Sequence, residues 1–160
     1  MWNHLFIQGN ANVGKSHICK FVANLLIKDH YKIIDQIIIP NKNVSKIDDF
    51  VALLDKDDRL VLVNTASDDR NCYNKLDDVI IRNNLNQRNL TVISTQRANP
   101  RFPMFNDYET LLDTSHSSFC TRLFIYHSIP SITSNIPLNI YCVGMADTAF
   151  NILKYAPYNL

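Results

Sequence analysis

The chain has 160 residues, of which 46% are hydrophobic and 19% charged. This length suits one domain, and this composition supplies an ordinary core and excludes a disordered chain. The net charge of +1 excludes a global positive field that would draw the protein to DNA or to a membrane, so the totals do not indicate a nucleic-acid partner.

The cysteines and the apolar runs indicate the compartment. None of the four cysteines forms a C-x-x-C pair or a metal-ligand cluster with histidine, as expected of free thiols in a reducing compartment. No run approaches the roughly 20 apolar residues that cross a bilayer, and Leu5–Ile7 is too short for a signal peptide. We expect a soluble, cytoplasmic protein without a membrane partner.

Strands and helices alternate over the first hundred residues of the prediction. Short apolar or β-branched runs predict strands, and apolar residues at helical spacing predict helices. The predicted strands are 4–8, 33–39, 60–63 and 90–93, and the predicted helices are 16–29, 45–54 and 72–86. This alternation predicts a three-layer α/β domain over residues 1–160, with a mainly parallel sheet covered on both faces.

The last sixty residues are less regular. Residues 98–118 contain two prolines and predict a loop or lid with a short helix at 107–113. Two further strands are predicted at 123–126 and 140–143, separated by a polar connector at 130–137, and a final helix is predicted at 146–155.

A glycine-containing motif joins the first predicted strand to the first predicted helix. Residues 9–16 match G-x-x-x-x-G-K-[ST] and hold two of the three glycines of the chain. The backbone amides before the helix form an anion nest, and the helix directs its positive end toward a bound phosphate. The predicted phosphate site comprises Gly9, Asn10, Ala11, Asn12, Val13, Gly14, Lys15, Ser16 and the following His17.

Each key position of this motif has a physical reason. Gly9 lets the chain leave the strand sharply, and Gly14 removes a Cβ where the phosphate passes close to the backbone. Lys15 places an ammonium between the β- and γ-phosphates, and the Ser16 hydroxyl is positioned to ligate Mg²⁺.

On these residues the chain resembles the P-loop NTPase superfamily, specifically over residues 4–26 and only in topology beyond them. The resemblance implies binding of a nucleoside triphosphate with Mg²⁺. Residues 74–77 match the N-K-x-D string that reads guanine, but they precede the end of the third predicted helix instead of following a late strand. We therefore prefer ATP to GTP.

The acid that usually helps to hold Mg²⁺ in this superfamily is missing from its expected place. The predicted strand at 60–63 ends in Asn64 and Thr65, and the first acids come later, at Asp68 and Asp69. Either one of these carboxylates turns back toward the metal or the acceptor, or both are solvated loop charges. In the second case, Ser16 and water hold the metal.

A second resemblance is to the ATPase branch of the superfamily, which includes AAA+ loaders and motors. There, a strand beside the phosphate-loop strand ends in a polar residue that contacts the γ-phosphate, a role that Thr95 or Gln96 would fill. Arg122 is similar in position to an arginine finger, which neutralises charge on the transferred phosphoryl group. This hypothesis makes Lys15, Gln96, Arg122, Asp68 and Asp69 the catalytic candidates, and it implies a homo-oligomer.

Two alternatives use the same phosphate loop differently. A small nucleotide or metabolite kinase would use Arg97 and Arg101 as lid arginines, with the acids near residue 68 facing a small-molecule acceptor. A nucleotide-dependent switch with a protein partner would bind ATP and hydrolyse it slowly or not at all. The residues favour hydrolysis slightly and leave the acceptor open.

Overall fold

A six-stranded mixed sheet forms the centre of the computed structural model, which describes residues 1–10, 13–41, 47–125 and 135–160, with the backbone alone for 135–139. The strand order is β2-β3-β4-β5-β1-β6. Strands β4, β5, β1 and β6 pair in parallel, whereas β2–β3 and β3–β4 are antiparallel. The strands are β1 (Trp2–Gly9), β2 (Lys32–Ile39), β3 (Asp49–Lys56), β4 (Arg59–Asn64), β5 (Leu90–Arg97) and β6 (Phe119–Ile125).

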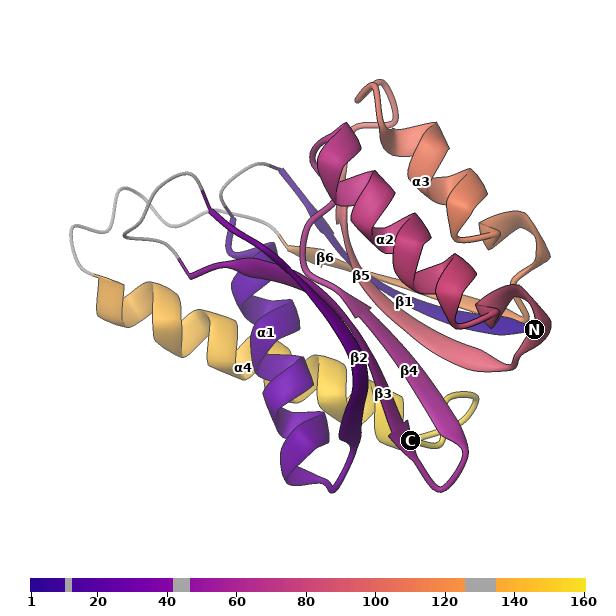
Figure 1. Cartoon of the computed structure of the whole chain (residues 1–160). Helices are drawn as coiled ribbons and strands as arrows, with labels where there is room; N and C mark the ends of the chain where they lie inside the picture. The colour runs from indigo at the N-terminus through magenta and orange to yellow at the C-terminus, as the bar shows by residue number, and fades with distance from the viewer. Residues whose placement is uncertain (11–12, 42–46, 126–134) are drawn as a thin grey trace.

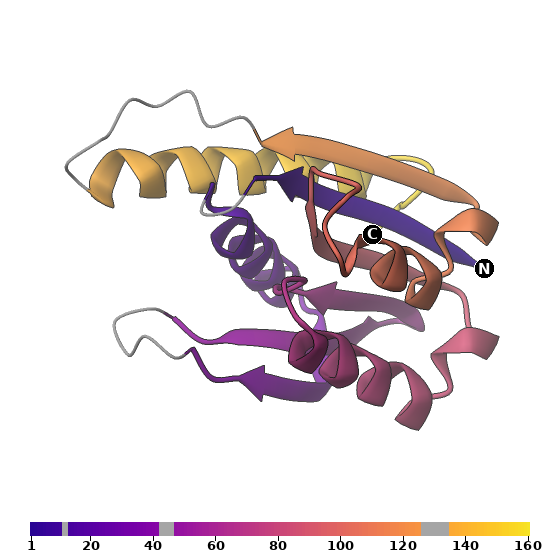
Figure 2. The same cartoon turned by 90° about the horizontal axis from the view of Figure 1, so that it is seen from above.

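Helices cover both faces of this sheet (Figures 1 and 2). One face packs against α1 (Lys15–Lys28) and α4 (Asn135–Lys154), and the other against α2 (Arg70–Arg82) and α3 (Phe105–Leu111). Two 3₁₀ turns, η1 (Leu85–Gln87) and η2 (Thr114–His116), lie beside the second pair of helices. The predicted α/β class with a mostly parallel sheet is confirmed at this level.

The alternation of side chains along β1 divides the core into two clusters. Leu5 and Ile7 pack with residues of α1 and α4, whereas Phe6 packs with residues of α2 and α3. All three side chains are almost completely buried. Strand β1 thus lies between β5 and β6 with both faces buried, and the predicted phosphate loop follows its carboxyl end.

The predicted helix at 45–54 is wrong, because residues 49–56 form β3; residues 45 and 46 lie outside the described part of the chain. The apolar spacing fitted a helix, but Val51–Leu54 is a continuous buried run that pairs with β2 and β4. Asp57 and Asp58 both have positive φ and form the two-residue turn of the β3–β4 hairpin. A short apolar run is compatible with either element, and pairing with two neighbours decides for the strand.

The predicted strand at 140–143 is also wrong, because these residues lie inside α4. The deciding pattern lies further on: Cys142, Ala146, Ala149 and Leu153 are buried at helical spacing in the core cluster that α1 shares. The helix predicted at 146–155 is thus the second half of a longer one. Of the connector at 130–137, residues 130–134 lie outside the described part of the chain, as does Tyr126 at the end of the predicted strand 123–126.

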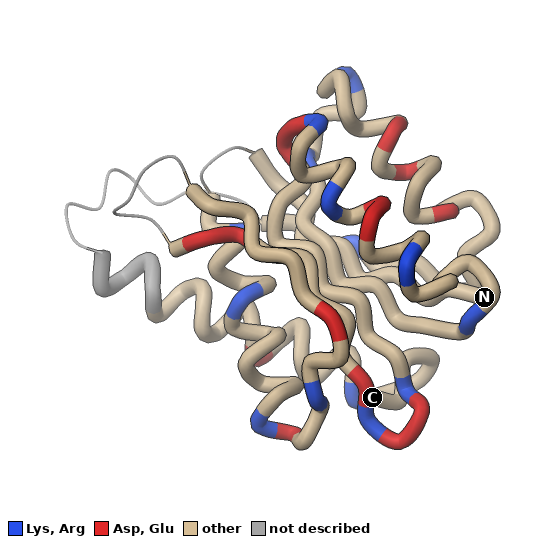
Figure 3. Tube along the Cα trace, in the orientation of Figure 1, with Lys and Arg blue, Asp and Glu red and all other residues tan. Residues whose placement is uncertain are grey.

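The remaining predicted elements are present with small shifts of their ends. The helix at 72–86 is α2 followed by η1, and the short helix at 107–113 is α3. Among the described residues, no helix combines the length and apolar character needed to span a membrane. Figure 3 shows Lys and Arg scattered among Asp and Glu along the trace.

Candidate functional site

Both glycines of the predicted phosphate loop have a backbone reason, although it differs from the one predicted for each. Gly14 adopts the left-handed region, with φ of 89°, immediately before the first residue of α1. A Cβ on Gly9 would lie 2.8 Å from the carbonyl oxygen of Ile125 and 2.9 Å from Cγ2 of Val13. Residues 11 and 12 of the motif lie outside the described chain. The turn thus belongs to Gly14 and not to Gly9, where it was predicted, and Gly9 is required by its close approach to Ile125 and Val13. The predicted approach of a phosphate to Gly14 stays a prediction.

The Lys15 side chain is buried beside the loop that precedes it. Its Nζ donates a hydrogen bond to the carbonyl oxygen of Asn10 at 2.5 Å, and the residue is only 7% exposed. Burial, and then the positive charge of Arg97, lower the pKa of Lys15, while the charge of Asp68 acts in the opposite direction. An anion beside this ammonium would favour its charged form.

Ser16 is held by the chain that follows β4. Its Oγ donates to the carbonyl oxygen of Thr65 at 2.8 Å. Thr65 is fully buried, so the hydroxyl is anchored to a rigid part of the fold. The Ser16 hydroxyl keeps its oxygen lone pairs while it donates, and it can still ligate a cation.

A cavity of about 330 Å³ opens beside these residues. Its phosphate-loop side is formed by Gly14, Lys15, Ser16 and His17. The opposite side is formed by Asp49, at the start of β3, and by residues that follow β4 or end β5, namely Ala66, Ser67, Asp68 and Thr95. Lys20, Asn41 and Ile47 complete the lining.

The polar residue that ends β4 has a structural role. The side chain of Asn64 is fully buried and donates through Nδ2 to the Ser94 Oγ of β5 at 3.0 Å. It bridges two neighbouring strands, in agreement with its place between parallel partners. The missing strand-end acid is thus replaced by an inter-strand amide.

The two acids predicted to follow this strand have different environments. Asp69 caps α2 by accepting from the backbone N–H of Cys72 at 2.9 Å. Asp68 lines the cavity and forms an ion pair with the Arg97 Nε at 2.7 Å. Of the two, Asp68 has the position from which a carboxylate could act on a ligand.

Arg97 is held against the phosphate-loop strand. It pairs with Gly9 in the β1–β5 register, and its carbonyl oxygen accepts from the Gln8 Nε2 at 3.2 Å. Its guanidinium lies 5.1 Å from the centre of the Phe102 ring and is about one-fifth exposed. The sequence placed Arg97 just after a predicted strand and gave it a role only as a lid arginine, whereas in the structure it is the last residue of β5.

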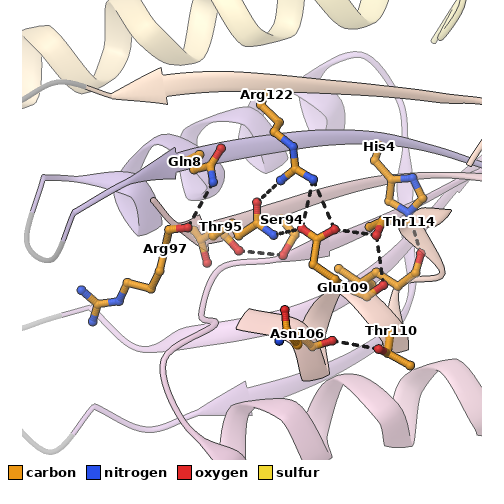
Figure 4. A network of polar contacts seen from close by, with 12 residues as sticks. His4, Gln8, Ser94, Thr95, Arg97, Asn106, Glu109, Thr110, Thr114 and Arg122 are labelled. Atoms are coloured by element: carbon orange, nitrogen blue, oxygen red, sulfur yellow. Dashed lines mark hydrogen bonds and ion pairs between the residues drawn. The ribbon is translucent and has the colours of Figure 1, made fainter. Parts of the chain in front are cut away.

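Arg122 and Glu109 belong to a polar cluster near α3 (Figure 4), and Gln96 contacts both of them. Arg122 donates to the Gln96 Oε1 and, at 3.0 and 3.2 Å, to both carboxylate oxygens of Glu109. Gln96 Nε2 also donates to Glu109, and the guanidinium lies 4.9 Å from the centre of the Phe6 ring. Neither Gln96 nor Arg122 lines the cavity beside Lys15. The structure therefore does not bring these two catalytic candidates to the predicted phosphate site, and their partners are Glu109 and each other.

Glu109 is the anionic centre of this cluster. Burial raises the pKa of Glu109, but hydrogen bonds from Thr114 and Gln96 and the charge of Arg122 outweigh that effect and hold the pKa below its ordinary value.

Thr95 lies on the face of β5 opposite to Gln96, because successive side chains of a strand alternate between the two faces. It lines the cavity and donates to the Ser67 Oγ at 3.2 Å.

Asp49 is a cavity residue that sequence reasoning missed. The error follows from the false helix at 45–54, because a helix gave no reason to place this carboxylate at the carboxyl edge of the parallel strands. Strand β3 runs antiparallel to β4, so its first residues lie beside the last residues of β4. The turn of this hairpin, Asp57–Asp58, lacks the glycine that usually indicates a two-residue hairpin, so its signal in the sequence is weak.

Comparisons of this chain with protein-family models, with curated proteins and with solved structures found no match. Any functional conclusion therefore depends on the site and its motif.

The residues around the cavity fit a nucleotide phosphate chain better than a metal ion alone. Among the described residues, no group of three or more His, Cys, Asp or Glu side chains could hold a metal. The glycines, the buried ammonium and the N-terminus of the 14-residue helix α1 instead suit an anion. Mg²⁺ keeps several waters and takes substrate phosphate oxygens as ligands, so one serine hydroxyl suits its binding with a nucleotide.

Residues 74–77, which match the guanine-reading string, lie in the middle of α2. They do not line the cavity, so they give no support for GTP.

Proposed function

We propose that this chain is a P-loop nucleotide-binding domain that binds ATP with Mg²⁺ and hydrolyses its γ-phosphate. The observation that carries the proposal is the arrangement at the start of α1. Left-handed Gly14, buried Lys15 and Ser16, which is hydrogen-bonded to Thr65, follow one another on the wall of a single cavity.

The phosphate chain would be held mainly by fixed positive groups. Backbone amides at the start of α1 and the positive end of its dipole attract an anion without a large cost of reorganisation. Lys15 supplies a full positive charge, and burial lowers the pKa of its ammonium group. Negative phosphate oxygens would raise that pKa and keep the ammonium protonated, so ligand and lysine stabilise one another.

The Mg²⁺ would be held by the Ser16 hydroxyl together with phosphate oxygens and water. Bound there, the ion would neutralise charge on the β- and γ-phosphate oxygens. Thr65 orients the serine through its carbonyl oxygen.

Water is the acceptor that the surroundings of Asp68 favour. The Asp68 side chain is 56% exposed, so bulk water reaches this part of the cavity. A kinase must exclude water from the same place, because water competes with its acceptor. Asp68 and Thr95 would orient the attacking water, and Arg97 would balance the charge of Asp68.

The test is binding and turnover of ATP and GTP with Mg²⁺ by the wild type and by Lys15→Ala. Lys28→Ala, at the exposed end of the same helix, is the matched control. We expect nucleotide-dependent stabilisation and phosphate release in the wild type and the control, both lost in Lys15→Ala. Binding that is indifferent to Lys15 would refute the proposal.

The same assay separates the alternatives. ADP formed without free phosphate, and only with added nucleosides or metabolites, would replace hydrolysis by a kinase reaction. Lys15-dependent binding without any turnover would replace it by a switch.

A further inference from the structure

Asp49 occupies the part of the site where the sequence lacks a strand-end acid. It is the first residue of β3, and the antiparallel pairing brings this end of β3 to the carboxyl end of β4. The residue lines the same cavity as Ser16. Because β3 runs antiparallel to β4, its first residue, Asp49, lies near the carboxyl ends of the parallel strands.

Thr65 connects Asp49 to Ser16. The Thr65 carbonyl oxygen accepts from the Ser16 Oγ at 2.8 Å, and the Thr65 Oγ1 lies 3.1 Å from Asp49 Oδ1, within hydrogen-bond distance. The same Oγ1 also accepts from the backbone N–H of Phe50 at 2.8 Å. Thr65 is fully buried, and this one residue contacts both the hydroxyl of Ser16 and the carboxylate of Asp49.

Among the described residues, a lysine from α1 forms an ion pair with Asp49. Lys20 Nζ lies 3.0 Å from Asp49 Oδ1, and the two side chains are 11% and 20% exposed. Within the described chain, the contacts of this carboxylate with Thr65 and Lys20 both use Oδ1. By comparison, Asp69 is occupied as a helix cap, and Asp68 is paired with Arg97.

We propose that Asp49 is the carboxylate that holds Mg²⁺ at this site, accepting hydrogen bonds from water bound to the ion, while Ser16 is the direct protein ligand. This inference rests on the proposed function. Lys20 neutralises the carboxylate in the absence of the ion and competes with it when the ion binds. Mg²⁺ suits such a site because it dehydrates reluctantly and is commonly held through its waters.

The experiment is a Mg²⁺ titration of ATP binding under conditions without turnover, read by calorimetry and by the rise in melting temperature. The variants are Asp49→Asn, Lys20→Met and Asp48→Asn. Asp48 is the matched control, because it is the neighbouring exposed acid and it accepts from the Asn41 backbone N–H. ATP binding in excess EDTA is measured in parallel.

For Asp49→Asn we expect the Mg²⁺ concentration at half-effect to rise by about 10–100-fold, the usual effect of losing a group that orients a metal ligand. Binding of metal-free ATP stays equal or tightens, because a negative charge near the phosphates is lost. Lys20→Met lowers the Mg²⁺ midpoint, because the carboxylate loses its competing cation, and Asp48→Asn leaves it unchanged.

Three results would overturn the inference. They are an unchanged Mg²⁺ midpoint in Asp49→Asn, a raised midpoint in Lys20→Met, and an equal rise in the Asp48→Asn control. Since Lys20→Met predicts a shift in the opposite direction, it tests the idea even where Asp49→Asn fails to fold. A wild type that binds no ATP refutes the proposed function instead, so the two failures are distinguishable.

Discussion

The three glycines of the chain lie in three different environments: Gly9 and Gly14 in the predicted phosphate loop and Gly144 in α4. Replacing each by alanine therefore tests the backbone of the loop, with Gly144 as the control. At Gly9 the new methyl would lie 2.8 Å from a backbone oxygen and 2.9 Å from the Val13 side chain. Overpacking of this kind costs about 1–3 kcal/mol. At Gly144, exposed within α4, nothing lies within 4 Å of the new atom. Alanine there should stabilise the helix by about 0.5–1 kcal/mol.

These energies translate into melting temperatures that a thermal scan resolves. For a domain of this size each kcal/mol is worth about 2–4 °C. Gly9→Ala should therefore melt roughly 2–12 °C below the wild type, whereas Gly144→Ala should melt about 1–4 °C above it. Gly14→Ala must hold a left-handed φ of 89°, at a cost of about 1–2 kcal/mol.

The second readout is the stabilisation that Mg-ATP adds to each variant. Gly144→Ala should retain all of it, because α4 presents this residue away from the loop, whereas Gly9→Ala should lose most of it. A Gly9→Ala protein with wild-type melting and wild-type ATP response would refute the close approach of strand end and loop. A destabilised Gly144→Ala would refute the assignment of α4 as a helix.

Further predictions concern the charged groups and the thiols. Arg122→Ala should cost about 1–3 kcal/mol in unfolding free energy and leave ATP affinity unchanged; lost turnover at unchanged stability would restore the arginine-finger hypothesis. Because the folded-state pKa of Glu109 is lowered, its contribution is present above the unfolded-state pKa and is lost as pH falls through the folded-state value. Urea denaturation of Glu109→Gln should accordingly show a weaker loss of stability below about pH 4.5. Arg97→Ala should lower phosphate release, because Asp68 loses the charge that balances it, while Arg101→Ala, the nearby control, should not. Alkylation followed by peptide mapping should find exposed Cys120 modified before the three buried cysteines; equal rates would contradict their burial.

The local parts of the site could be predicted from sequence because their signals are contiguous. A strand, a spaced glycine pair, Lys15 and Ser16 follow one another within a few residues, and each has a backbone or charge requirement of its own. The positions of β1 and α1 followed from the same stretch. The buried strand β5 was likewise evident from a short apolar run.

The long-range parts could not be predicted in this way. Whether Thr95 or Gln96 faces the cavity depends on the register between β5 and β1, and one residue of shift reverses the answer. The pairing of Arg122 with Glu109 joins β6 to α3, and no local pattern encodes it. Asp49 required recognition of an antiparallel hairpin whose turn is built from two aspartates instead of the usual glycine.

The bond between Lys15 and the Asn10 carbonyl oxygen has a consequence for ligand discrimination. In the free protein the loop satisfies its own ammonium, so any anion must first compete with an internal acceptor. A lone inorganic phosphate replaces that acceptor and gains little else. A polyphosphate chain would contact the Lys15 ammonium, the N-terminus of α1 and the region of the Ser16 hydroxyl at the same time. These several contacts would more than compensate for the lost hydrogen bond to Asn10. If the loop acts as proposed, the hydrogen bond between Lys15 and Asn10 therefore favours polyphosphates over the small anions that are abundant in the cell.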